Sequence, residues 1–300
     1  MIILIKNSTK GSIAAAVSNT IFGLSFLFSK TALNVAHPLI ILSVRFAVAF
    51  IFMSLLIVFR IIKVNYKGKN LKGLFFMALA QPFFYFIFEI YGIKFTSSSI
   101  SGIIIALIPV ISLILSVFIL KEVPTKTQVV CTIISLISVS AISILQKNTG
   151  KNYPGGIALL FLAALCSAVF NLLSRKESGG FSAVERTYFM FLVAAVGFNI
   201  LAPIVLGGAY TEGLITAIQD KGFIISILFL SIISSCITFL LYNYATGEIT
   251  ITRATAFANI STIVSVVAGM VVLHEQLSVV QLILCGVILL GVFGVNYYGK

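Results

Sequence analysis

The chain has 300 residues, of which 60% are hydrophobic and only 9% are charged, whereas about 25% of the residues in a soluble domain carry a charge. So few charges cannot cover the surface of a soluble protein of this length, which makes lipid the surrounding solvent. The formal net charge is +12, but the basic residues lie between apolar runs and form no aromatic-interleaved patch, which excludes a nucleic-acid-binding surface.

Apolar runs long enough to cross a bilayer follow one another along the whole chain. About 20 helical residues span the hydrocarbon core, and helices are expected because open strand edges cannot be satisfied there. The first run follows Lys6 and Lys10, as in a signal peptide, but it is too long, and Asn19 and Lys30 leave no clear cleavage site, so we assign it as a span. The ten predicted spans are residues 12–33, 39–59, 73–93, 100–120, 128–146, 156–174, 187–207, 223–244, 252–273 and 277–298.

Basic residues cluster at alternate ends of the spans, which predicts how the chain is oriented. With a cytoplasmic N-terminus, 14 of the 20 Lys and Arg residues lie inside and five outside, while Arg45 lies within the second span. The loop between spans two and three contributes most of this bias. We therefore expect a multi-pass protein of a bacterial inner membrane with both termini in the cytoplasm, which agrees with an even number of spans.

The chain also resembles itself at long range. A shift of 153 positions overlays residues 91–143 on residues 244–296, and it places Ser112 on Ser265 and Glu122 on Glu275. These matches divide the chain into a first half (residues 1–148) and a second half (residues 149–300). Because each half contains an odd number of spans, the second half enters the membrane from the opposite side, as in the inverted repeats of transporters.

Short motifs follow one another in a fixed order along the two halves. They are Phe22-Gly23-Leu24-Ser25-Phe26, Ser29-Lys30, His37-Pro38, Arg45-Phe46, Leu120-Lys121-Glu122, Ser174-Arg175-Lys176 and Leu273-His274-Glu275-Gln276-Leu277-Ser278. In order and spacing, the chain resembles the EamA branch of the drug/metabolite transporter superfamily. The resemblance implies ten helices around a central cavity and transport of amino acids, nucleotide-related metabolites, sugars or toxic compounds. The chain departs from the family pattern at Pro109 and in having no tryptophan.

Two charged residues fall within predicted spans. Glu89 is the only acidic residue that lies within a span and away from its very end, and Arg45 lies at a comparable depth. A charge at membrane depth costs a few kcal/mol or more unless it is paired or hydrated. One interpretation makes Glu89 a proton or cation site and Arg45 a contact for a carboxylate. The alternative is a structural Glu89–Arg45 ion pair or gate, or two interfacial side chains.

Uncharged polar residues within the spans provide further candidates for contacts with a solute. Gln81, Tyr85 and Glu89 are spaced four residues apart on one helical face, and Pro82 frees a backbone carbonyl group beside them. This stripe is typical of a cavity lining. Hydrogen bonds between helices are the alternative for each polar residue. The other candidates within apolar runs are Asn19, Asn171, Tyr242 and Asn259.

Small residues at four-residue spacing predict close helix packing. They lie on spans four and nine, which we expect to form a pseudo-symmetric pair near the interface between the repeats. These residues are Ser112, Ser116, Ser261, Ser265 and Gly269.

The sequence contains no phosphate-binding glycine loop, no catalytic pair of carboxylates and no metal-ligand spacing; its four cysteines all lie in apolar runs and resemble buried hydrophobic residues. We therefore expect no enzyme activity, no cofactor and no bound metal. The sequence predicts a secondary transporter that exports small metabolites such as amino acids by alternating access. Membrane lipid and protons are the further partners that we expect. The alternatives are uptake or exchange, and a non-transporting receptor or membrane enzyme. No pattern in the sequence predicts an oligomeric state.

Overall fold

A computed structural model of the protein describes residues 2–95, 104–105, 107–145, 154–273 and 279–298. Every regular element among these residues is a helix, and none of them forms a strand. Six helical segments are long and apolar enough to cross a membrane, which identifies a multi-pass membrane protein. They are Ser8–Leu33, Pro38–Val58, Lys72–Gly92, Pro154–Glu177, Ala183–Leu206 and Lys221–Glu248.

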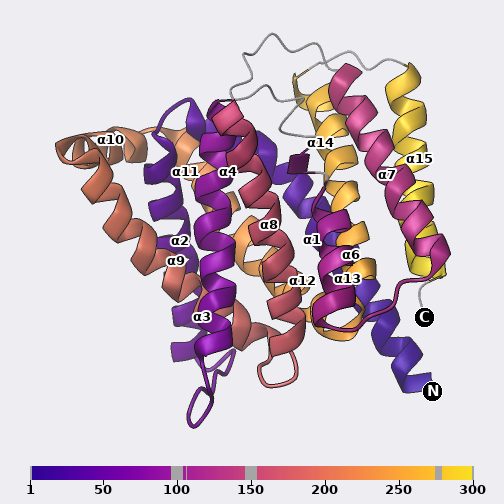
Figure 1. Cartoon of the computed structure of the whole chain (residues 1–300). Coiled ribbons are helices and arrows are strands. Elements are labelled where there is room, and N and C mark those ends of the chain that lie inside the picture. Colours follow the sequence, from indigo (N-terminus) through magenta and orange to yellow (C-terminus); the bar gives the residue numbers. More distant parts are fainter. Residues whose placement is uncertain (1, 96–103, 106, 146–153, 274–278, 299–300) are drawn as a thin grey trace.

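The first half of the chain starts with two long helices, α1 (Ile2–Leu33) and α2 (Pro38–Val58) (Figure 1). The imidazole of His37 accepts a hydrogen bond from the Leu39 amide and Pro38 occupies the first turn, so these two residues define where α2 begins. The third predicted span is α3 (Lys72–Ala78), the π-helical segment η1 (Leu79–Phe84) and α4 (Tyr85–Lys94). The shorter helices α6 (Ile108–Ile119) and α7 (Lys126–Leu145) follow.

The second half starts with α8 (Pro154–Glu177) and α9 (Ala183–Leu206), and a capping box between Ser182 and Glu185 starts α9. The short helix α10 (Gly208–Gln219), which the sequence did not predict, lies in the connection to the next span. That span is α11 (Lys221–Leu228), the π-helical η2 (Phe229–Ile237) and α12 (Thr238–Glu248). The ninth predicted span is divided into α13 (Ile251–Ala256) and α14 (Ala258–Leu273), and the last helix is α15 (Val279–Tyr297).

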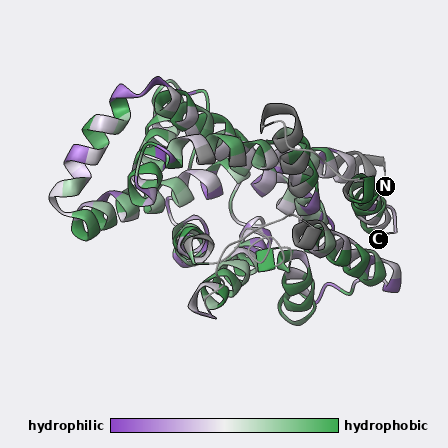
Figure 2. Cartoon of the chain, turned by 90° about the horizontal axis from the view of Figure 1, so that it is seen from above, coloured by the Kyte–Doolittle hydropathy of each residue, from purple (hydrophilic) through white to green (hydrophobic). Residues whose placement is uncertain are grey.

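Helices of one half pack mainly against helices of the other half. Helix α1 packs against α12 and α14, and α8 packs in the corresponding way against α4 and α6. Helix α2 pairs with α9, and α7 pairs with α15 at one end of the molecule (Figure 1). Exchanging the two halves therefore reproduces the main helix contacts. Seen from above, hydrophobic residues predominate along most of the helices (Figure 2).

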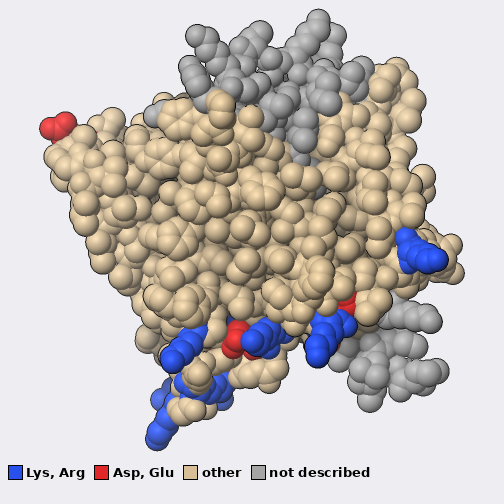
Figure 3. Space-filling model, in the orientation of Figure 1, with Lys and Arg blue, Asp and Glu red and all other residues tan. Residues whose placement is uncertain are grey.

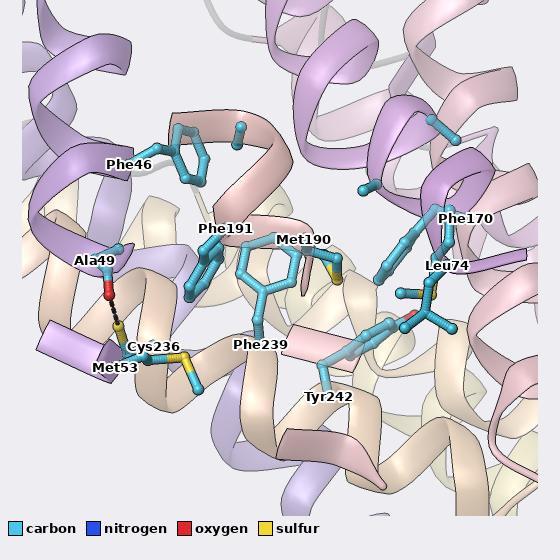
Figure 4. Packing of buried hydrophobic residues seen from close by; sticks show 14 of the residues in the cluster. Phe46, Ala49, Met53, Leu74, Phe170, Met190, Phe191, Cys236, Phe239 and Tyr242 are labelled. Atoms are coloured by element: carbon cyan, nitrogen blue, oxygen red, sulfur yellow. Dashed lines mark hydrogen bonds between the residues drawn. The ribbon is translucent and has the colours of Figure 1, made fainter. Parts of the chain in front are cut away.

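A buried cluster of hydrophobic side chains, several of them aromatic, packs between helices of both halves (Figure 4). The Phe46 ring of α2 stacks on the Phe198 ring of α9 with centroids 5.5 Å apart. Phe191 and Phe239 meet edge to face at 5.9 Å. Lipid tails are as apolar as these rings, so close packing rather than exclusion of water holds such helices together.

Charged side chains gather at one end of the molecule (Figure 3). This basic end carries the hairpin of residues 59–71 that leads into α3, and both marked termini lie toward it (Figure 1). Both salt bridges found among the described residues involve helix ends or loops of this region. Lys69 Nζ lies 2.9 Å from Glu185 Oε1, and Arg175 Nε lies 3.5 Å from Glu122 Oε1.

The contact between α1 and α14 generates a stability prediction. A Cβ atom at Gly23 would lie 2.7 Å from both the Ser261 carbonyl oxygen and Val264 Cβ. Gly23→Ala should therefore push the helices apart and lower the free energy of unfolding by about 1–3 kcal/mol. Thermal denaturation in detergent measures this loss as a lower Tm. Gly286→Ala is the control, because no atom lies within 4 Å of its added carbon; equal Tm values for the two variants would contradict the close contact.

Candidate functional site

Each half of the chain interrupts its third span with a π-helical segment. Gln81 in η1 has φ −149° and ψ 129°, values outside the helical region, and the ring nitrogen of Pro82 has no hydrogen to donate. The shift of 153 positions derived from the sequence places Gln81 on Ser234 and Pro82 on Ser235, which both lie in η2. Segments of π-helix are rare in proteins, and those that occur are often found at functional sites. The two interruptions therefore mark corresponding places in the two halves.

Arg45 joins α2 to the second of these segments. Its side chain is buried, its Nε donates to Ser235 Oγ at 2.9 Å, and its Nη2 donates to Ser234 Oγ at 3.4 Å. The guanidinium group also lies over the Phe86 ring at 5.0 Å from the ring centroid, a favourable position for a cation. The charge is thus held by uncharged groups.

Glu89 also has an uncharged partner. The buried Tyr85 hydroxyl donates to Glu89 Oε1 at 2.7 Å. Arg45 and Glu89 attract each other electrostatically, but the only salt bridges among the described residues lie elsewhere. The structure therefore brings the two charges near each other, on α2 and α4, without the ion pair that the sequence allowed as an alternative.

Three of the predicted polar residues form one chain of hydrogen bonds across three helices. Tyr242 Oη on α12 donates to Asn171 Oδ1 on α8 at 3.0 Å. Asn171 Nδ2 in turn donates to Ser112 Oγ on α6 at 3.2 Å. All three side chains are buried. The arrangement ties α6, α8 and α12 together and uses both ends of the Asn171 amide.

The other polar candidates differ in whether their side chains form hydrogen bonds. Asn19 Nδ2 donates to the Ala15 carbonyl oxygen of its own helix at 2.8 Å. Asn259 is 5% exposed and makes no side-chain hydrogen bond to another described residue. Gln81 Oε1 is fully buried without a partner, although most buried polar atoms have one. Gln81 and Asn259 therefore keep unused capacity for a hydrogen bond.

Two of the small residues on spans four and nine lie against helices other than the expected partner. Ser112 contacts Asn171 on α8, and the Ser261 backbone lies against Gly23 on α1. The hydroxyls of Ser116 and Ser261 bond back to carbonyl groups of their own helices. Spans four and nine still meet, because α6 packs against α13. The side chain of Ser265 and the surroundings of Gly269 lie outside the described residues.

A second buried polar cluster, missed in the sequence, lies toward the basic end. Arg186 of α9 donates to Ser174 at the end of α8 and to the Asn243 carbonyl of α12. Nearby, Glu122 accepts from the Ile251 amide at 3.0 Å and pairs with Arg175. Burial raises the pKa of Glu122, and these two partners oppose that rise. The cluster gathers the ends of helices from both halves.

Ser234 and Ser235 were not predicted as site residues, because serines within an apolar run usually indicate helix packing. The 153-residue shift was the available signal, since it places them opposite Gln81 and Pro82.

The described residues contain no cluster of three or more His, Cys, Asp or Glu side chains that could hold a metal ion.

Several membrane-spanning helices with two charged residues between them, the buried Arg45 and the partly buried Glu89, are typical of membrane transporters. The EamA-like transporter family matches residues 9–144 and 154–297 of the chain. The chain therefore belongs to this family, which confirms the resemblance seen in the motifs.

Similar proteins agree with this assignment. The "Uncharacterized transporter YcxC" of Bacillus subtilis (strain 168) is 36% identical over 290 residues, which cover 96% of this chain and 93% of that protein. An "Uncharacterized transporter" of Archaeoglobus fulgidus is 26% identical over 281 residues, covering 94% and 96% of the two chains. A crystal structure of another protein shares the fold, with a TM-score of 0.82, 13% identity and coverage of 97% of this chain and 98% of that chain.

The hydrogen-bond chain at Asn171 generates a second prediction. Tyr242→Phe removes the donor to Asn171 Oδ1 and leaves this buried oxygen without a partner. We expect stability to fall by about 0.6–2 kcal/mol, the range measured for bonds between membrane helices. Thermal denaturation in detergent provides the measurement. Tyr244→Phe is the matched control on the same helix, since the Tyr244 hydroxyl bonds to no described residue; an equal loss there would show that the bond to Asn171 contributes nothing.

Proposed function

We propose that the protein is a secondary transporter that exports amino acids or related small zwitterionic metabolites by alternating access. One observation carries the proposal: Arg45 and Glu89 interact electrostatically within the bundle, each is held by uncharged groups, and neither forms a salt bridge with a described residue. Burying a charge is costly unless it is paired. A ligand that carries both a carboxylate and an ammonium group would neutralise both residues.

Unused atoms of the two side chains fit this ligand. Arg45 Nη1 and Glu89 Oε2 form no hydrogen bond with a described residue, and neither is among the fully buried unsatisfied atoms. A planar guanidinium is suited to binding a carboxylate. Gln81 Oε1 offers an additional acceptor for an ammonium or hydroxyl group, and Asn259 adds polar capacity on α14.

Two inverted five-helix repeats, residues 1–148 and 149–300, would provide the alternating access. Three observations support this division. The family matches one segment in each half, the two π-helical segments correspond under the 153-residue shift, and exchanging the halves reproduces the helix pairs. The ten spans would surround the solute path, with spans four, five, nine and ten formed by the shorter helices.

The basic end supports a cytoplasmic location for both termini. Lys and Arg gather there (Figure 3), and cytoplasmic loops of bacterial inner-membrane proteins carry this excess. An orientation with this end inside would leave α10 at the outer surface.

Counterflow in proteoliposomes tests directly whether the protein transports a zwitterion. Wild-type protein should exchange an amino acid at least about tenfold faster than its carboxamide analogue, because a hydrogen bond to a charged group contributes about 1.5–3 kcal/mol. Arg45→Gln should lower transport of the amino acid and remove this preference. Arg60→Gln, in the exposed hairpin, is the control and should behave like wild type. If Arg45→Gln protein keeps the wild-type preference, Arg45 does not bind the carboxylate.

Glu89 is the candidate for coupling to protons. Glu89→Gln keeps an acceptor for the Tyr85 hydroxyl but cannot change its charge. In proteoliposomes with an imposed pH gradient, we expect the variant to lose the dependence of transport on that gradient while keeping exchange at equal pH. Full retention of the dependence would remove Glu89 as the coupling site.

A further inference from the structure

A lateral groove runs between α3 and α9, two helices that pack against each other near the basic end. It consists of two adjoining hollows of about 550 and 480 Å³ that share the Phe75 and Phe189 side chains as walls. Phe75 and Val196 are about half exposed, so the groove opens to the surroundings of the bundle and not to its core. The lining residues are Leu71, Lys72, Phe75, Phe76, Phe189, Leu192, Val193, Val196 and Gly197.

The groove is apolar except at one end. Lys72 lies at the end nearest the basic hairpin, is exposed, and has no salt bridge among the described residues. The neighbouring Lys69 is already paired with Glu185 at 2.9 Å. Glu177 lies beside Gly73 on the other side of this region without forming a salt bridge with Lys72. Lys72 therefore places a positive charge, without a salt-bridge partner among the described residues, at one end of the apolar groove.

The length of the groove corresponds to one leaflet. Phe189 and Gly197 are eight residues apart on α9, or about 12 Å at 1.5 Å per residue, which is close to half of a hydrocarbon core of about 30 Å. Lys72 begins the membrane-spanning segment Lys72–Gly92, and this is where a headgroup would lie. The groove thus matches a molecule with an acyl chain and an anionic headgroup.

We propose that this groove binds one anionic phospholipid from the leaflet at the basic end, with an acyl chain along α3 and α9 and the phosphate against Lys72. The groove begins at Leu71 and Lys72, where the hairpin of residues 59–71 passes into α3, and this hairpin carries further exposed basic side chains. These side chains raise the local positive potential, which favours acidic lipids. The bound lipid would stabilise the position of α3, the helix that leads directly into η1.

Native mass spectrometry of the full chain in detergent tests the site, with phosphatidylglycerol and phosphatidylcholine of identical acyl chains as probes. Wild-type protein should retain one phosphatidylglycerol in preference to phosphatidylcholine. Lys72→Gln should weaken phosphatidylglycerol binding about fivefold, the factor that corresponds to about 1 kcal/mol per basic residue near the surface. Val196→Trp should fill the half-exposed groove and abolish retention of both lipids.

Lys176→Gln is the matched control, because Lys176 is also exposed near the basic end but does not line the groove. It should keep the wild-type preference. Equal retention of the two lipids by wild type, or an equal loss in Lys176→Gln and Lys72→Gln, would overturn the proposal. Unchanged retention in Val196→Trp would show that headgroups bind the hairpin without the groove. A dimer that excludes lipid would assign the groove to a second copy of the chain and would also overturn it.

Discussion

The guanidinium group of Arg45 constrains much of the surrounding structure. A buried cation in a lipid-surrounded bundle cannot rely on water, so its donors must find acceptors on neighbouring helices. Ser234 and Ser235 supply hydroxyl oxygens from η2, and Phe86 supplies the negative face of its ring. Two successive serines both reach Arg45 from a π-helical segment. The charge on α2 and the interruption in the span α11–α12 therefore belong to one arrangement.

The interruption in η1, in contrast, contains a buried polar atom that has no hydrogen-bond partner among the described residues. Gln81 adopts a non-helical conformation there, and its side-chain oxygen is buried without a hydrogen bond. An orphaned acceptor inside a protein costs about 1–3 kcal/mol, so it persists only where the rest of the fold tolerates it or a ligand completes it. The proposed solute path passes between η1 and η2, and a donor group on the solute would relieve this cost. The same contact would connect the solute to the place where the span is least regular.

Much of the helical framework could be predicted from the sequence, because lipid permits few alternatives to apolar helices. The sequence also contains local signals for helix starts: His37-Pro38 starts α2, and a capping box of Ser182 and Glu185 starts α9 four residues before the predicted span at 187–207. The π-helical segments were not predicted, since they depend on contacts with other helices and leave no periodicity of their own. Helix α10 was missed because an apolar window long enough for a span does not detect a short helix in a connection.

The candidate site was predicted less completely for the same physical reason. Spacing along one helix places Tyr85 and Glu89 on one face, and the structure joins them by a hydrogen bond. Spacing cannot say which helix lies opposite, so the link between Tyr242, Asn171 and Ser112 and the serines that hold Arg45 emerge only from the packing. Their similar depth allowed an ion pair between Arg45 and Glu89, but in the structure each charge has its own hydroxyl partners and keeps one group, Arg45 Nη1 or Glu89 Oε2, without a described partner.

Polar contacts at the basic end add a final constraint on the proposed alternating access. Arg186 connects the ends of α8, α9 and α12, while Glu122 connects the end of α6 to α8 and to the start of α13. Opening this end would separate charged and hydrogen-bonded groups that belong to both halves. Burial raises the pKa of Glu122, so its carboxylate takes up a proton more readily than an exposed one, and protonation would remove the charge that pairs with Arg175. A conformational change that opens the basic end would therefore be favoured when Glu122 is protonated, because the pair with Arg175 is then lost.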